Sequence, residues 1–406
     1  MTLFKLGGNI NAMKRVYGSW IEKLATNKFL FLTGPRQVGK TTLGLQWTKK
    51  NNGSSLNWDI PEDREKILEN IFTKRIHSIQ HNYLLLDEIH KYQRWKAALK
   101  GLFDRKVENL HLVITGSAKM DTYQKGGDSL LGRYEYLRIY PLTIGELSHC
   151  TFKKPPENWR NLKLQTHDEE SMMQKLESLS GFPEPYLSND LLKYNRWSTL
   201  RRSNLIRQDL RDISDVRFIT LVDHLTLLLK DRIGAPLSLN SLRQDIQIGF
   251  DTVSHWIELL ERLYYLFRIS PFSKKIQRSL SKEKKAYLLD WAQIKDSASR
   301  FENLIACHLL KSIHFWKDLG YGDYELNYFR DKDKREIDFI ITLDRRPIVA
   351  IECKFNSDEI SSSFFQWKKY YPKVPCYQLI RKPGVSHLAP SGIHIVSAGR
   401  FLNALN

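Results

Sequence analysis

Charged residues interrupt two apolar strand-like segments in the stretch REIDFIITLDRRPIVAIECKF, residues 335–355. Side chains alternate between the faces of a strand, so Glu336 and Asp338 share one side, as do Glu352 and Lys354. The intervening TLDRRP is typical of a turn, which lets the two strands pair as a hairpin. In the right register Asp338, Glu352 and Lys354 lie about 5 Å from neighbour to neighbour. Two carboxylates could hold Mg²⁺ and a water there, with Lys354 positioning the nucleophile for attack on a phosphodiester. The alternative is a cross-strand ladder of salt bridges.

A second constellation lies near the start of the chain, in FLFLTGPRQVGKTTL. An apolar strand leads into the pattern G-x-x-x-x-G-K-[ST], whose backbone N–H groups can surround phosphates at a helix N-terminus. Lys40 is expected to reach the β- and γ-phosphates of ATP, and the Thr41 hydroxyl to hold Mg²⁺. The alternative, an ordinary glycine turn, does not explain the flanking strand and helix. The expected nucleotide-binding residues are Gly34, Pro35, Arg36, Gln37, Val38, Gly39, Lys40, Thr41 and Thr42.

An acidic strand end, YLLLDEIH, supplies the groups that such a loop requires for hydrolysis. Asp87 is expected to contact Mg²⁺ through water, and Glu88 to orient and deprotonate the attacking water. The alternative is a strand that merely ends in an acidic turn. Two further residues are candidates: Ser117, at the end of LHLVITGSA, as a γ-phosphate sensor, and Arg133 as an arginine finger in cis or in trans. For Arg133 an ordinary surface position remains open.

The elements that must position these groups alternate between strands and helices up to about residue 150, which predicts a parallel sheet with flanking helices. A polar, proline-bearing stretch from Thr151 to Glu170 follows and reads as a linker. Helical patterning then resumes, and Arg201, Arg202 and Arg207 lie on an expected helix, facing ATP, DNA or solvent.

A helix-turn-helix pattern follows, with helices expected at Ser241–Ile246 and Asp251–Leu263. Its apolar residues recur at helical spacing, which indicates a core-packed face. The following YYLFRIS suggests a wing. A winged helix would present Ser254 and His255 to a DNA groove, whereas a packing module would not.

Composition bounds the remaining possibilities. The 406 residues suggest two or three domains, and 42% hydrophobic residues exclude a disordered chain. No apolar run approaches the ~18 residues of a membrane span, and the four scattered cysteines form no zinc pattern, so we expect a cytoplasmic protein without a membrane partner. The net charge of +18, from 63 basic and 45 acidic residues, favours a polyanion partner such as DNA or simply a soluble basic protein. A basic run at 271–285 could contact phosphate or form a solvated loop.

The motifs GPRQVGKTTL, LLLDEIH, ITGSA, LGRYEYLRIYPLTIGEL and SGFPEPY resemble prokaryotic ATPases of the AAA superclass that carry a C-terminal domain of the restriction-endonuclease type. The resemblance spans nearly the whole chain. Asp338 and Glu352-x-Lys354 are similar to the PD-(D/E)XK nuclease motif, although Ile337 stands where that motif has proline. The resemblance implies an acidic Glu302 on the first helix of the last domain, as a further metal ligand, and Gln366 with Tyr370 in Q-x-x-x-Y spacing.

These patterns together predict an α/β protein in four parts: a P-loop AAA-type ATPase domain with a parallel sheet (1–150), a linker and helical lid (151–215), a winged-helix-like domain (216–285), and a PD-(D/E)XK nuclease-like α/β domain (286–406). We expect ATP and Mg²⁺ as cofactors, DNA as partner, and a possible ring-forming homo-oligomer. The leading function is ATP-driven processing or remodelling of DNA, with or without cleavage. The alternatives are a nucleotide-dependent switch and a C-terminal domain that only binds DNA or a partner.

Overall fold

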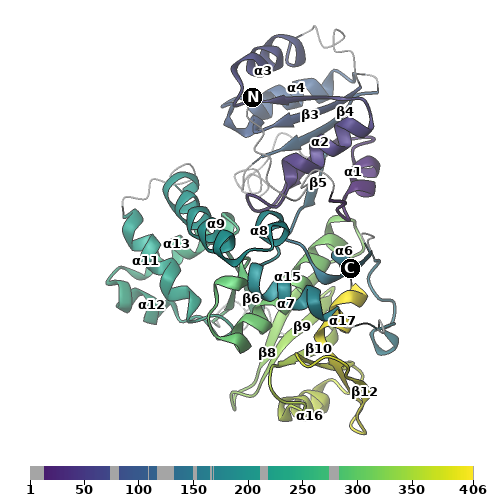
Figure 1. Cartoon of the computed structure of the whole chain (residues 1–406), viewed down its shortest axis with the longest axis vertical. Helices are drawn as coiled ribbons and strands as arrows, with labels where there is room; N and C mark the ends of the chain where they lie inside the picture. The colour runs from purple at the N-terminus through teal and green to yellow at the C-terminus, as the bar shows by residue number, and fades with distance from the viewer. Residues whose placement is uncertain are drawn as a thin grey trace. The chain divides into compact units, whose positions relative to one another are not determined.

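The computed structural model describes residues 13–73, 82–107, 109–116, 132–149, 153–164, 167, 169–210, 218–273 and 283–405. The chain divides into two compact units, Met1–Tyr140 and Pro141–Asn406. Each unit has its own sheet and is described by itself (Figure 1).

The first unit is a parallel α/β sheet, as the alternating pattern predicts. Its strand order is β2-β3-β4-β1-β5, and all of its pairs are parallel. The strands are β1 (Phe29–Thr33), β2 (Ser54–Asn57), β3 (Tyr83–Asp87), β4 (His111–Thr115) and β5 (Tyr134–Arg138). The helices are α1 (Gly18–Leu24), α2 (Lys40–Lys50), α3 (Pro61–Lys66) with the π-helix η2 (Ile67–Ile71), the 3₁₀ turn η4 (Ile89–Lys91), and α4 (Trp95–Asp104).

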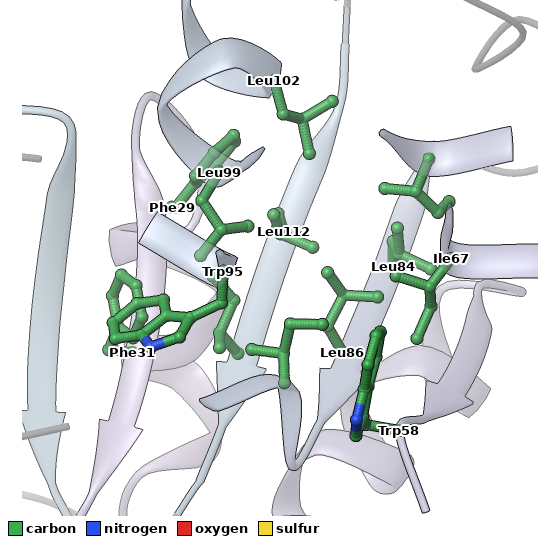
Figure 2. Packing of buried hydrophobic residues seen from close by; sticks show 13 residues of the cluster. Phe29, Phe31, Trp58, Ile67, Leu84, Leu86, Trp95, Leu99, Leu102 and Leu112 are labelled. Carbon is green, nitrogen blue, oxygen red and sulfur yellow. The ribbon is translucent and has the colours of Figure 1, made fainter. Parts of the chain in front are cut away.

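Apolar side chains cover both faces of this sheet, which explains why its central strands read as unbroken apolar runs. On one face a buried cluster joins the strands to η2, η4 and α4; Figure 2 shows Trp58, Trp95, Leu99 and their neighbours within it. On the other face α2 packs so closely that a Cβ on its Gly44 would lie 2.6 Å from Leu85. The two layers of helices hold the carboxyl ends of β1, β3 and β4 in one row, where ligands of open α/β sheets bind.

The second unit begins with helices. They are α6 (Ile144–His149), α7 (Glu170–Leu179), α8 (Pro183–Ser188), α9 (Leu191–Asn204) with the π-helix η7 (Leu205–Asp209), α11 (Ile219–Lys230), α12 (Leu239–Ile246) and α13 (Phe250–Arg262), with a 3₁₀ turn η6 (Trp159–Asn161). The pair α12–α13 agrees with the expected helix-turn-helix to within two residues at each end. The buried residues of α13 include Val253, Trp256 and Ile257, which is the apolar face that the spacing indicates.

An eight-stranded mixed sheet completes the second unit, in the order β12-β13-β11-β10-β9-β8-β6-β7. The strands are β6 (Leu266–Pro271), β7 (Lys285–Leu288), β8 (Tyr324–Arg330), β9 (Glu336–Leu343), β10 (Arg346–Lys354), β11 (Cys376–Ile380), β12 (Ser386–Leu388) and β13 (Ile393–Ser397). The segment expected to begin a wing forms β6, which pairs with β7 in antiparallel fashion and with β8 in parallel. Strands β6 and β7 therefore extend the C-terminal sheet across the boundary expected at residue 285.

Helices sandwich this sheet. The 22-residue α15 (Ser297–Asp318), preceded by the 3₁₀ turn η8 (Trp291–Gln293), contacts β7, β8 and β10, and α17 (Ala398–Leu405) contacts β11 and β13. The other helix, α16 (Ser362–Tyr370), buries Phe364 and Trp367 against Ile337, Ile340 and Ala350. Figure 1 shows β8, β9 and β10 side by side, and these strands carry the charged residues noted in the sequence.

Candidate functional sites

The glycine loop that follows β1 has the backbone that a phosphate-binding loop requires. Gly34 has a φ of 122°, and a Cβ there would lie 2.2 Å from the carbonyl oxygen of Ile139, so only glycine fits. Gly39, with a φ of 93°, precedes the first residue of α2. Lys40 is buried, and its Nζ donates to the carbonyl oxygens of Gly34 (2.9 Å) and Pro35 (2.7 Å). The ammonium therefore lies inside the loop, where a triphosphate could exchange for these carbonyls.

Asp87 ends β3 and meets the glycine loop through hydrogen bonds. Its Oδ1 accepts from the hydroxyl groups of Thr41 (3.1 Å) and Thr115, and its Oδ2 accepts from the side-chain amide of Asn57 (3.1 Å). Burial raises the pKa of Asp87, and the nearby Glu88 adds to that rise, whereas the bonds from Thr115 and Thr41 oppose it. Thr41 and Asp87 thus lie together as predicted, and their oxygen atoms are the donors that Mg²⁺ prefers.

Two partners of Asp87 were missed in the sequence. Thr115 and Asn57 end β4 and β2, and their strands pair with β3 at the position of Asp87. The available signal was that both are polar residues closing strand-like runs, in the same way as Asp87 itself. Which strand lies beside β3 could not be read from those runs.

Glu88 follows Asp87 in a left-handed conformation, with a φ of 58°. Its Oε2 lies 3.3 Å from the Nζ of Lys91 and 3.7 Å from the Nε2 of His90. The carboxylate is about one quarter exposed, so solvent reaches it. A water-activating role would require it to turn from Lys91 toward the phosphates.

Arg15 is a further residue at the loop that the sequence did not single out. It is buried, and its two terminal nitrogens donate to the carbonyl oxygens of Val38 and Tyr140, each at 2.7 Å. The guanidinium thereby ties the loop to the segment that follows β5. Nothing in the local pattern MKRVY distinguished it from the neighbouring Lys14.

The other two nucleotide-site candidates have different outcomes. Ser117 lies outside the described residues. Arg133 precedes β5 beside the first residue of β1, because its carbonyl oxygen accepts from the Phe29 amide. The glycine loop follows the opposite end of β1, about 13 Å away at 3.3 Å per residue. The Arg133 guanidinium pairs with Asp104 at 2.8 Å. This position disfavours a role in cis and leaves the role in trans as a prediction.

The second site is formed where β9 and β10 separate. Their pairing extends to Phe339 opposite Ile351. Beyond it the Oδ2 of Asp338 accepts from the Cys353 amide (2.9 Å), and the Oε2 of Glu352 accepts from the Asp338 amide (3.3 Å). Lys354 Nζ lies 3.0 Å from Glu352 Oε1. The expected trio is therefore linked through hydrogen bonds and an ion pair.

An irregularity in β9 changes the simple alternation that the sequence suggests. Asn327 of β8 pairs with Ile340 and Phe329 pairs with Ile337, so β9 has one extra residue at 338–339. Such a bulge re-aims side chains. Asp338 consequently contacts residues outside the hairpin, which the expected register did not include.

The principal outside contact of Asp338 is Lys285, the first residue of β7. Its Nζ lies 3.1 Å from Asp338, 3.2 Å from Glu302 of α15 and 2.6 Å from Glu336. The Lys285 side chain is 1% exposed. The prediction that Lys285 belongs to a basic run available to phosphate is wrong for this residue, because burial removes its ammonium from solvent. Of the other basic residues in that run, Lys284 is partly buried, and residues 274–282 lie outside the described part of the chain.

The carboxylates here have strongly perturbed acidity. Burial raises the pKa of Glu302 to about 7, with repulsion from Asp338 adding and Lys285 opposing. Burial likewise raises the pKa of Glu352 to about 8, with Asp338 adding and Lys354 opposing. Perturbed titratable groups gather at functional sites, but ion-pair networks also produce them.

The remaining residues singled out in the sequence lie on α9, α13 and α16. Arg201 of α9 is 5% exposed, and its guanidinium lies 4.3 Å from the ring centroid of Phe182, so it does not face ATP or DNA. His255 on α13 is exposed and Ser254 is partly exposed, as the helix-turn-helix pattern expects. Gln366 Nε2 donates to the Tyr370 hydroxyl (3.3 Å) on the outer part of α16.

Among the described residues no three His, Cys, Asp or Glu side chains are grouped so that they could hold one metal ion. Within the same part of the chain no helix combines the length and the apolar character needed to cross a membrane.

Comparisons with family models match three parts of the chain. Residues 26–148 match a model described as an AAA domain. Residues 174–294 and 299–392 each match a model described as a domain of unknown function. The AAA match covers the parallel sheet with the glycine loop, Asp87 and Glu88, and it agrees with the resemblance noted in the sequence.

Two curated relatives share about a quarter of their aligned residues with this chain. An uncharacterized protein of Haemophilus influenzae is 23% identical over 335 residues, covering 76% of this chain and 78% of its own. An uncharacterized protein of Methanocaldococcus jannaschii is 26% identical over 225 residues, covering 48% and 45%.

Among solved structures, the replication initiator DnaA bound to AMPPCP and single-stranded DNA is 18% identical, with a TM-score of 0.28 over 64% of this chain and 90% of that chain. The Thermotoga maritima RuvB Holliday junction branch migration motor is 14% identical, with a TM-score of 0.29 over 62% and 85%. At such TM-scores neither similarity defines the fold or the function of this chain.

Proposed function

We propose that the first unit binds and hydrolyses ATP with Mg²⁺, and that the chain uses this turnover to remodel or process DNA. The observation that carries the proposal is the 3.1 Å hydrogen bond between Thr41 of the glycine loop and Asp87 of β3. This bond brings together a hydroxyl and a carboxylate, which are the oxygen ligands that a hard cation such as Mg²⁺ prefers. Thr41 directly follows Lys40, whose ammonium is expected to contact the phosphates. The match of residues 26–148 to the AAA domain supports the same conclusion.

Each residue has a distinct task in this proposal. Lys40 exchanges the carbonyl oxygens of Gly34 and Pro35 for the β- and γ-phosphates. Thr41 and Asp87 would hold Mg²⁺, which neutralises phosphate charge when bound. Glu88 turns from Lys91 to accept a proton from the attacking water.

The basic character of the chain supports DNA as the partner. The excess of 63 basic over 45 acidic residues attracts a polyanion. The exposed His255 on α13 marks one surface, the helix-turn-helix pair α12–α13, through which DNA could be held. Arg133 could act on nucleotide held by a neighbouring copy in a ring.

The test is the ATPase rate of the full chain with and without duplex, single-stranded and four-way DNA. We expect DNA to stimulate turnover in the wild type and Lys40→Ala to lose nucleotide binding. Lys49→Ala is the matched control, because Lys49 is exposed on the same helix α2. Absence of both DNA stimulation and salt-sensitive DNA binding would refute the proposal.

A nucleotide-dependent switch is the second candidate function. It is favoured by the contacts of Lys40 with loop carbonyls and of Glu88 with Lys91, which engage two residues needed for hydrolysis. The switch predicts slow, single-turnover hydrolysis by a monomer. Steady multiple turnover by a higher oligomer would count against it.

DNA cleavage at the second site would require Asp338 to hold a metal ion with Glu302 and Glu352. Asp338 and Glu302 both contact the ammonium of Lys285, so cleavage requires Lys285 to withdraw. A cleaving enzyme would lose Mg²⁺-dependent cutting in Asp338→Ala and keep it in Glu88→Gln. If the wild type does not cut DNA, the remaining hypothesis is that the C-terminal domain only binds DNA or a partner.

A further inference from the structure

Lys285 is surrounded by carboxylates from two other elements. Glu302 comes from α15, and Glu336 and Asp338 come from β9; one oxygen of each lies 2.6–3.2 Å from the Lys285 Nζ. The hydroxyl of Tyr287, two residues along β7, donates to the same Glu302 oxygen at 2.7 Å. The ammonium is therefore the shared partner of three acidic groups.

The backbone around Lys285 determines where this ammonium lies. Lys285 pairs with Ile269 of β6 on one side of β7. On the other side it forms a bridge with Pro236, and the Leu237 amide donates to the Lys284 carbonyl oxygen at 2.8 Å. Gly234, in the same segment, has a φ of 81°, and a Cβ there would lie 3.2 Å from a Glu302 oxygen. Both edges of β7 thus hold Lys285 in position.

We propose that Lys285 is the resident cation of this cluster and occupies the position that a divalent metal ion would otherwise take. Mg²⁺ requires oxygen ligands at about 2.0–2.1 Å and keeps several of its waters. An ion bound to the same oxygens would approach a buried ammonium to within about 3 Å, where the repulsion between the two cations is large. The donor set expected for a metal therefore does not fit one while Lys285 is present.

The position of Lys285, more than the net charge, sets it apart from the other basic groups. Counted with every carboxylate ionised, the cluster has four carboxylates and three basic groups and a formal charge of −1, and loss of any one basic group would make it −2. Only loss of Lys285 would leave Glu302, Glu336 and Asp338 without the cation that they share. The acidic members are Glu302, Glu336, Asp338 and Glu352, and the basic members are Lys285, Arg330 and Lys354.

Occupancy of the C-terminal cluster by Lys285 holds whether or not the first unit hydrolyses ATP. In the resting chain, therefore, no divalent ion lies at Asp338. We also expect one substitution, Lys285→Met, to convert the cluster into a metal site.

The experiment measures Mn²⁺ binding to the full chain without nucleotide, by electron paramagnetic resonance of free Mn²⁺. Every variant also carries Asp87→Asn, which silences the first site. The set comprises this parent, the parent with Asp338→Asn, Lys285→Met, Lys285→Met with Asp338→Asn, and Lys354→Met. Lys354→Met is the matched control, because it also removes one lysine paired with a carboxylate but leaves Lys285 in place.

We expect Lys285→Met to gain one Mn²⁺ per chain, at least about tenfold tighter than any binding by the parent. Asp338→Asn should abolish that gain, and Lys354→Met should not produce it. Mn²⁺ should raise the melting temperature of Lys285→Met and leave that of the parent unchanged.

A folded Lys285→Met chain that gains no Mn²⁺ would overturn the proposal. If Lys285→Met does not fold, the parent and its Asp338→Asn variant still decide the question. Equal Mn²⁺ stoichiometry in these two supports a metal-free cluster, whereas loss of one ion on Asp338→Asn shows that the metal binds beside Lys285 and overturns the proposal.

Discussion

Thr115→Val should shift the acidic limb of the ATPase pH profile toward higher pH. The Thr115 hydroxyl is one of three side-chain donors to the Asp87 carboxylate, together with Thr41 and Asn57. Valine has nearly the same shape as threonine but no hydroxyl. The substitution therefore removes one bond to the ionised carboxylate and leaves the packing at this 1% exposed position nearly unchanged.

The size of the shift follows from the energy of that bond. A hydrogen bond to a charged group contributes about 1.5–3 kcal/mol, and about 1.4 kcal/mol corresponds to one pH unit. Burial already raises the pKa of Asp87, and loss of the Thr115 bond raises it further. Because the ionised carboxylate is the form that holds Mg²⁺, the rate at low pH should fall, with the limb moving up by about one to two pH units.

The assay is steady-state ATP hydrolysis at saturating Mg²⁺ across the pH range, with folding checked at each pH. Thr33→Val is the matched control. Thr33 is a buried threonine at the end of β1, and its hydroxyl has no hydrogen-bond partner within the described residues. It should leave the limb in place. An unshifted profile in Thr115→Val would show that this hydroxyl does not support the ionised form of Asp87.

Three further predictions concern stability and the arginine. Lys311→Met should lower the free energy of unfolding of the second unit by about 3–5 kcal/mol in urea titrations, because it leaves the fully buried Glu146 without its cation; Lys311→Met with Glu146→Gln should recover much of the loss. Burial lowers the pKa of His308 to about 3, so stability should fall as pH drops from about 6.5 toward 3, because the unfolded chain takes up the proton first; His308→Gln should flatten that slope in pH-dependent melts. Arg133→Ala should leave the nucleotide affinity of a dilute monomer unchanged in equilibrium titrations, because Arg133 lies at the far end of β1; a clear loss of affinity would contradict that placement.

Much of the first site could be predicted because its determinants are local. The strand, glycine loop and helix that carry Lys40 and Thr41 are contiguous, and Gly34 is required by a backbone that passes beside Ile139. Asp87 could be assigned to the same edge because parallel strands end together. Thr115 and Asn57 could not be assigned, because their role depends on which strands flank β3.

The second site was predictable only in part. Asp338 and Glu352 were expected together from the hairpin, and their backbone and side-chain contacts agree with that expectation. The bulge in β9 and the neighbouring Lys285 were not foreseen, since a period-two pattern does not reveal an inserted residue or a strand from another segment.

The sequence by itself determined where phosphate and metal chemistry could occur, because the glycine loop and the charged strand ends are patterns of adjacent residues. Only the tertiary structure decided which charged side chains contact one another. Lys285 lies 53 residues before Asp338, and β7 comes to β9 through the pairing of β6 with β8 and the packing of α15. A buried ammonium among three carboxylates is a property of that arrangement, since the cost of burying each charge is offset only when its partners arrive from elsewhere in the chain.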